Sequence, residues 1–232
     1  MTLLDLVAML RRRLNDTGGD KGPPPVGYRY YWEADDTTCL LSNDDCVDFI
    51  NEAEREFCRR RPLLGEREFW VGAGTSTYWL DDNVLAVRWI RAKADGRAIR
   101  RITREERDRA PVVATPCSVY LEEPERRRIE LLAVPTTAET LVLAVEMLPD
   151  EPMTWACRDD CPTVEEPWHA TLVDHAAHLA YRVRDFDTHD PVAAERSALA
   201  FDRAVGPPRP APDIEWRRRL ADRNPRARAT FF

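Results

Sequence analysis

The feature that most constrains the fold is the hydrophobic period, which passes from 3.6 residues to 2 and back along the chain. Leu3, Leu6 and Leu10 recur at helical spacing, whereas apolar residues alternate with polar ones between positions 67 and 147. Helical spacing returns after Pro162. This order predicts a strand-rich module inserted into a helical domain.

Four helices are expected, two on each side of the insertion. The first follows Thr2 and ends near Leu14, and the second starts after Ser42 or Asn43 and stops at Pro62. Ser, Thr and Asn are preferred caps at the start of a helix, and Pro cannot continue one.

The two later helices carry their own boundary signals. Thr163 and Glu166 have the spacing of a capping box, which predicts the start of a long third helix. Asp190 followed by Pro191 predicts the start of a fourth helix, which Gly206 ends.

Between residues 67 and 147, turn signals rich in Gly, Asp and Pro separate six or seven short alternating runs. These runs predict a small antiparallel β-sandwich or barrel. The fold class is therefore α+β, with a discontinuous helical bundle of about four helices, the inserted β module and an extended C-terminal arm. We expect residues 1–66 and 149–205 to form the two parts of the helical domain, residues 67–148 the β domain, and residues 206–232 the arm.

The charge distribution separates this arm from the rest of the chain. The formal net charge is -7 at pH 7, yet residues 206–232 hold seven Arg against three acidic residues and carry +4. The remaining residues carry -11. Because affinity for polyanions comes from cationic contacts, the acidic body is not expected to bind phosphates over its whole surface. A basic arm on an acidic body indicates separate partners.

Residues 15–38 are expected to form a long excursion, because Gly18-Gly19 and Pro23-Pro24-Pro25 cannot propagate a helix. Loops of this length that carry several aromatic residues often form contact surfaces. The predicted partner-contact residues are Tyr28, Tyr30, Tyr31 and Trp32.

No catalytic, cofactor or metal site is expected, since the sequence has neither a phosphate-binding loop nor a nucleophile elbow. Residues of catalytic type gather only around the third helix, at His169, Asp174, His175, His178, Asp185, Asp187 and His189. A di-metal centre in a bundle would need a second Glu-x-x-His pair, and a zinc protease would need His-Glu-x-x-His. A metal-dependent hydrolase that uses this helix is kept as an alternative from a different class.

Cys157, Cys161 and His169 could supply three zinc ligands, although no fourth ligand is specified. The preferred interpretation is that both thiols pack under a loop. With no signal peptide and no membrane span expected, the six cysteines are predicted to be reduced.

Short segments along nearly the whole chain form a recognisable series. In chain order they are Thr2–Leu6, Arg11–Leu14, Asp16-Thr17, Ile50–Glu56, Cys58–Arg60, Tyr78–Asp81, Leu172–Ala176, Ala180-Tyr181 and Asp185–Pro191, followed by Phe201 and Gly206. In content and order this series resembles the head-to-tail connector or adaptor proteins of tailed bacteriophages, which form the neck ring that docks on the portal. The excursion at 18–38 departs from the family, whose members usually have a short loop there.

The resemblance implies a structural, non-enzymatic protein of the virion neck, assembled in the host cytoplasm. Such proteins form a ring, typically of twelve copies, which joins the portal to the tail, stopper or nozzle protein and continues the channel through which DNA passes. No cofactor and no membrane partner are implied. Another neck or tail-completion protein is the alternative; a stopper would have a purely β body.

The resemblance also implies that the C-terminal arm docks on the portal. Aromatic residues would anchor in portal crevices while arginines pair with acidic rims. The arm residues expected to do this are Trp216, Arg217, Arg218, Arg219, Arg226, Arg228, Phe231 and Phe232.

Overall fold

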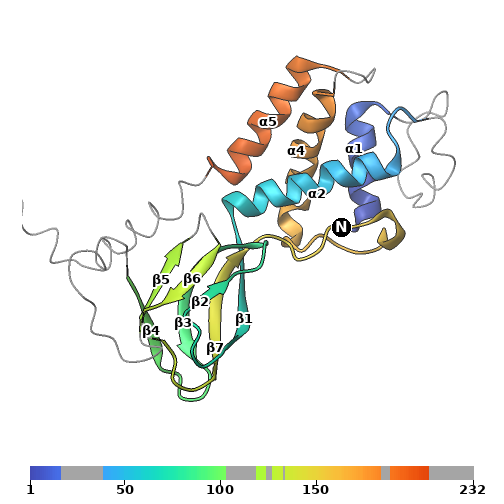
Figure 1. Ribbon diagram of the computed structural model, residues 1–232. Coiled ribbons are helices and arrows are strands. Elements are labelled where there is room, and N and C mark those ends of the chain that lie inside the picture. The colour runs from blue at the N-terminus through green and yellow to red at the C-terminus, as the bar shows by residue number, and fades with distance from the viewer. Residues whose placement is uncertain (17–38, 103–118, 124–126, 133, 184–188, 209–232) are drawn as a thin grey trace, which may run out of the picture. The chain divides into compact units, whose positions relative to one another are not determined.

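The computed structural model describes residues 1–16, 39–102, 119–123, 127–132, 134–183 and 189–208 (Figure 1). These residues divide into two compact units, a helical unit of residues 1–61 with 149–208 and a strand unit of residues 62–148. The described residues form four α-helices and seven strands, which confirms the predicted α+β class.

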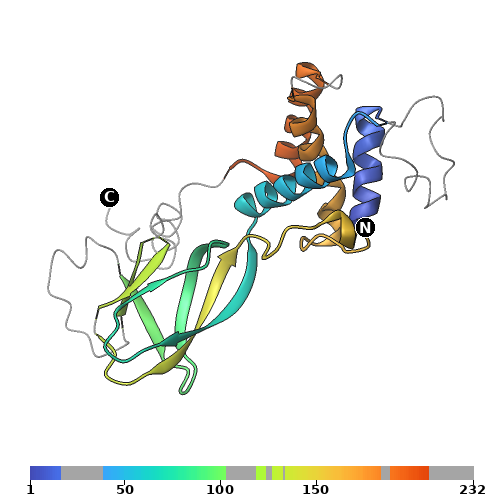
Figure 2. The same cartoon turned by 45° about the vertical axis from the view of Figure 1, so that its right-hand side comes forward.

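The helical unit is organised around its third α-helix. Its helices are α1 (Leu3–Leu14), α2 (Asn43–Arg60), α4 (His169–Tyr181) and α5 (Pro191–Val205). Helix α4 packs against the other three, and both Figure 1 and Figure 2 show it within this group. Ala176, Ala177 and Ala180 are fully buried on α4. Because these side chains are small, neighbouring helices can approach α4 closely.

The helix starts follow the sequence signals in three of four cases. Thr2 and Asp5 form the capping box of α1, and Ser42, rather than Asn43, forms the same box with Asp45 at the start of α2. The Asp190 carboxylate accepts hydrogen bonds from two backbone N–H groups in the first turn of α5. These side chains satisfy backbone donors that a helix leaves free at its start.

The capping box predicted from Thr163 and Glu166 is wrong. Helix α4 begins only at His169, after a 3₁₀ turn that spans Glu166–Trp168, and no side chain caps it. The Glu166 carboxylate lies 3.3 Å from the amino terminus of Met1. The backbone N–H of Thr163 donates instead to Glu54 of α2, so a side chain from a distant segment replaces the local cap.

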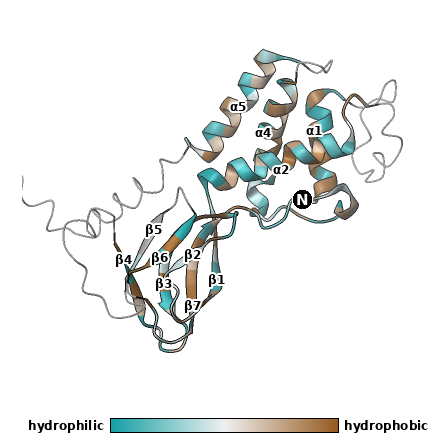
Figure 3. Cartoon of the chain, viewed as in Figure 1, coloured by the Kyte–Doolittle hydropathy of each residue, from teal (hydrophilic) through white to brown (hydrophobic). Residues whose placement is uncertain are grey.

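The strand unit is a single sheet around its own core. Its strands are β1 (Leu63–Val71), β2 (Thr77–Trp79), β3 (Val84–Ala92), β4 (Ala98–Ile102), β5 (Val119–Glu123), β6 (Arg128–Leu131) and β7 (Glu139–Met147), in the order β1-β7-β3-β4-β5-β6-β2. Leu141, Leu143 and Val145 alternate along β7 and lie in the core, and Figure 3 shows the apolar colouring of this strand. Strand β1 starts before the predicted position 67.

Two details of the sheet differ from the sequence prediction. Strands β4 and β5 pair in parallel, although all strands were expected to be antiparallel. Residues 103–118 provide the long connection that a parallel pair needs. Within the described residues no ladder joins the edge strands β1 and β2, so the sheet is open and a closed barrel or sandwich is not confirmed. The Phe69 and Tyr78 rings, from these two edge strands, lie 5.2 Å apart.

Helix α2 binds the chain where it returns from the strand unit. The Asn51 side chain donates to the Met153 carbonyl and accepts from its N–H, both at 2.9 Å. Glu54 Oε1 accepts from the backbone N–H groups of Thr163 at 2.6 Å and Val164 at 3.2 Å. Burial of Glu54 raises the pKa of its carboxyl group. These bonds attach the second half of the helical unit to the first.

Replacing Glu54 with Ala is expected to lower the free energy of unfolding by about 2–4 kcal/mol, because two backbone donors would lose their acceptor. Urea denaturation followed by circular dichroism at a helix-sensitive wavelength measures this change. Glu52→Ala is the matched control on the same helix, since the Glu52 carboxylate is 43% exposed and bonds to the exposed Arg59. Equal losses in the two variants would contradict the role assigned to Glu54.

Candidate functional site

The residues predicted to contact partners lie outside the described part of the chain. They are Tyr28, Tyr30, Tyr31 and Trp32 in the excursion, and Trp216, Arg217, Arg218, Arg219, Arg226, Arg228, Phe231 and Phe232 in the arm. The structure does describe the points at which both segments join the helical unit.

A buried ion pair holds the two ends of the excursion. Arg11 Nη1 lies 3.0 Å from Asp16 Oδ2, and both side chains are 2% exposed. Asp16 also accepts hydrogen bonds from the backbone N–H groups of Leu40 at 2.7 Å and Leu41 at 3.1 Å, while Arg11 Nη2 donates to Asn43 Oδ1. The Asp16 carboxylate therefore ties the start of the excursion to the residues that follow it.

The sequence analysis missed this ion pair. The run Arg11 to Arg13 suits the dipole at the end of α1, but Arg11 also falls between Val7 and Leu14 on the apolar face of the helix. A charged residue at an apolar position was the available signal, because a buried charge needs a partner.

The residues just before the arm are held by Arg60, the last residue of α2, and by Arg61, which follows it. Helix α5 ends at Val205, and Gly206 caps it as predicted. Arg60 Nη1 donates to the Gly206 carbonyl at 2.8 Å, and Arg61 Nε donates to the Val205 carbonyl at 3.1 Å. The last described residues before the arm are thus bound to the helical unit by side chains.

Two histidines of α4 lie side by side, with the His175 and His178 ring centroids 5.5 Å apart, but each ring also has its own neighbour in the bundle. His175 packs against the Phe201 ring, with ring centroids 4.7 Å apart, and His178 Nδ1 lies 3.0 Å from the Ala194 carbonyl. His169 is buried and its Nε2 lies 2.7 Å from the Val164 carbonyl. Each ring therefore packs or bonds within the bundle.

The acidic residues of this region are separated as well. Asp174 pairs with Arg13 at 2.7 Å, whereas Asp185 and Asp187 lie outside the described residues. Across the described ranges, no three His, Cys, Asp or Glu side chains lie close enough to hold a metal ion. These ranges also contain no helix with the length and apolar character needed to cross a bilayer.

The preferred interpretation of Cys157 and Cys161 was wrong. Both cysteines are exposed, not packed under a loop. Cys157 ends a short 3₁₀ turn that spans Trp155–Cys157, Cys161 follows four residues later, and no residue of this turn is buried. This part of the chain lacks the surrounding side chains that bury a thiol.

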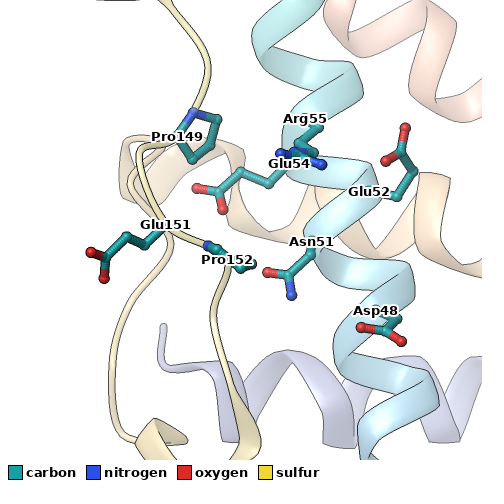
Figure 4. A pocket seen from close by; sticks show the side chains of 8 residues that line it. All are labelled: Asp48, Asn51, Glu52, Glu54, Arg55, Pro149, Glu151 and Pro152. Carbon is teal, nitrogen blue, oxygen red and sulfur yellow. The ribbon is translucent and has the colours of Figure 1, made fainter. Parts of the chain in front are cut away.

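An acidic pocket of about 270 Å³ lies beside α2 (Figure 4). In Figure 4 the Glu54 carboxylate extends from the helix toward Pro149 and Pro152. The lining residues are Asp48, Asn51, Glu52, Glu54, Arg55, Pro149, Glu151 and Pro152. Four carboxylates against one guanidinium attract a cationic group, and this lining includes no Ser, Thr, Cys or His that could act as a nucleophile.

A helical unit interrupted by a strand-rich insertion is the arrangement that the sequence resemblance implies for a phage head-to-tail adaptor. Comparison with known families agrees. Residues 1–227 match the SU10 adaptor protein family, so the chain belongs to that family. Among curated proteins, no match to this chain was found.

His175 of α4 makes the free energy of unfolding depend on pH. Burial and the nearby His178 lower the pKa of His175 from 6.5 to about 4, against the opposing charges of Glu56 and Glu52. Between these two pH values the unfolded chain binds a proton that the folded chain does not, so the free energy of unfolding falls as the pH falls. His175→Gln is expected to make this fall shallower.

Urea midpoints measured across this pH range test the prediction. His189→Gln is the matched control, because it makes the same substitution at an exposed histidine. If His175→Gln and the wild type lose stability in parallel, His175 does not titrate as described.

Proposed function

We propose that this protein is a head-to-tail adaptor of a tailed bacteriophage. Copies of the chain form a ring of twelve that joins the portal to the downstream tail, stopper or nozzle protein and continues the DNA channel. The observation that carries the proposal is the family match over residues 1–227, which takes in the helices, the strands and most of the basic arm.

The charge of the chain supports a channel role. Residues before the arm carry a net -11. A basic channel would hold DNA phosphates, whereas carboxylates repel them and leave the DNA free to move. The proposed mechanism is therefore the fit of interfaces, with no bond chemistry and no cofactor.

We propose that residues 209–232 are the docking arm, with the eight arm residues named above as its contacts. Guanidinium groups bind carboxylates in a fixed bidentate geometry, and large aromatic side chains supply most of the affinity at many interfaces. The arm starts at 209 rather than at the predicted 206, because Gly206 is bound to Arg60 in the helical unit.

The alternative of a stopper fits less well. Its body was expected to consist of strands with little helix, and the described residues include four α-helices. A metal-dependent hydrolase gains no support either, since His169, His178 and Asp174 bond within the bundle and the described residues contain no group of three metal ligands.

Mass photometry of the chain mixed with the portal protein of the same phage tests the proposal. We expect the portal particle to gain about twelve times 26.7 kDa, the mass of one chain. A chain truncated after Pro208 is expected to leave the portal at its own mass while its circular dichroism spectrum keeps its helical signal, because tails of this kind contribute little to a core. Normal portal binding by the truncated chain would contradict the arm assignment.

A matched pair of arm variants separates charge from length. Replacing Arg217, Arg218 and Arg219 with Gln should weaken portal binding by about tenfold or more, because charge-assisted hydrogen bonds are lost. Replacing Asp213, Glu215 and Asp222 with their amides changes as many charges and should leave binding unchanged or stronger. The opposite order would show that the arm does not dock on acidic groups.

A further inference from the structure

The C-terminal end of α5 is capped from outside its own helix. The last carbonyls of a helix have no partners within it. Here the Gly206 carbonyl accepts a hydrogen bond from Arg60, the last residue of the neighbouring helix α2, and the Val205 carbonyl accepts one from Arg61, the C-cap residue that follows. Two cations at this position also oppose the negative end of the helix dipole.

Both guanidinium groups are held in place by further contacts. Arg60 Nε donates to Glu56 at 2.8 Å and Nη1 to Asp202 at 2.5 Å, its guanidinium lies 4.9 Å from the Phe201 ring, and its side chain is only 9% exposed. The Arg61 guanidinium stacks over the Trp168 ring at 4.3 Å. Arg61 is otherwise exposed, so Arg60 is the more firmly held of the two. We call these two residues the Arg60/Arg61 clamp.

The residues that follow restrict the direction in which the chain continues. Gly206 has φ +97°, a conformation that side chains other than Gly rarely adopt. Pro207 and Pro208 come next, and each proline ring fixes its own φ. The clamp and this Gly-Pro-Pro sequence together set where the chain leaves the helical unit.

We infer that Arg60 and Arg61 are positioning residues that aim the arm at its partner. This inference rests on the proposed function of residues 209–232. A segment whose first residues are already ordered loses less conformational entropy when it binds, and this raises affinity without any new contact. The clamp therefore contributes to docking although neither arginine belongs to the arm.

The double variant Arg60→Met/Arg61→Met tests the inference, since Met keeps a long apolar side chain but donates no hydrogen bond. Arg59→Met is the matched control: Arg59 is the neighbouring residue and, among the described residues, it pairs with Glu52 and Glu56 on its own helix. We expect amide hydrogen exchange of residues 202–206 to become about tenfold faster in the double variant, with a loss of about tenfold in portal affinity. The control should change neither.

Gly206→Ala is an independent second variant that leaves both arginines intact. An added Cβ at this position meets nothing within 4 Å, so its effect comes from the positive φ alone. It should weaken portal binding while the circular dichroism spectrum and melting temperature of the helical unit stay close to the wild type.

The outcomes are distinct. Faster exchange in the double variant with unchanged portal affinity overturns the positioning role, and unchanged exchange overturns the clamp itself. If the wild type and Arg59→Met do not bind the portal either, the proposed function fails and the inference fails with it. Portal binding by the wild type and by Arg59→Met distinguishes this failure from a failure of the clamp, because both proteins keep Arg60 and Arg61.

Discussion

The hydrogen bonds from Asn51 and Glu54 to the returning chain are the constraint on which the helical unit depends. Residues 62–148 separate α2 from the segment that it binds. The entropy cost of closing such a connection grows only slowly, by about 0.6 kcal/mol for each doubling of its length. A whole strand unit can therefore occupy this position, provided that specific bonds fix the place where the chain returns. Four hydrogen bonds to backbone groups do this here.

Helix α2 contributes at each of its ends as well as in the middle. Asn43, in its first turn, accepts a hydrogen bond from Arg11 beside the buried ion pair, and Arg60 in its last turn binds the end of α5. Its apolar positions, including Ile50 and Phe57, meanwhile lie in the core. A single helix thus contacts the residues that flank the excursion, the chain that returns from the strand unit and the residues just before the arm.

Local signals in the sequence predicted most of the helix boundaries, because caps and stops act over a few residues. Thr2, Ser42, Asp190 and Gly206 all mark helix ends in the structure. Thr163 failed as a signal because Glu54, more than a hundred positions away, satisfies its backbone N–H. The parallel pairing of β4 with β5 could not be predicted either, because the alternation of apolar and polar residues along a strand does not reveal the direction of its partner strand.

The candidate site likewise has one part that the sequence predicts and one part that depends on contacts between distant residues. The charge and aromatic content of the arm are properties of composition, and the sequence shows them directly. The Arg60/Arg61 clamp depends on the end of α2 meeting the end of α5, which the sequence of either helix does not reveal. Only packing distinguishes Arg60, whose side chain is 9% exposed, from Arg59, whose side chain is 48% exposed.

In the proposed ring, the contribution of the Arg60/Arg61 clamp to portal affinity recurs in every copy of the chain. When several arms bind one portal, each docking event after the first takes place at a high effective concentration, and the total affinity follows the per-arm affinities together. A tenfold loss for each arm corresponds to about 1.4 kcal/mol per copy, and it recurs at every copy in the ring. A clamp with a modest effect on one chain would then decide whether the assembled ring stays on the portal, which explains why two buried or stacked arginines are placed where the chain leaves the last helix.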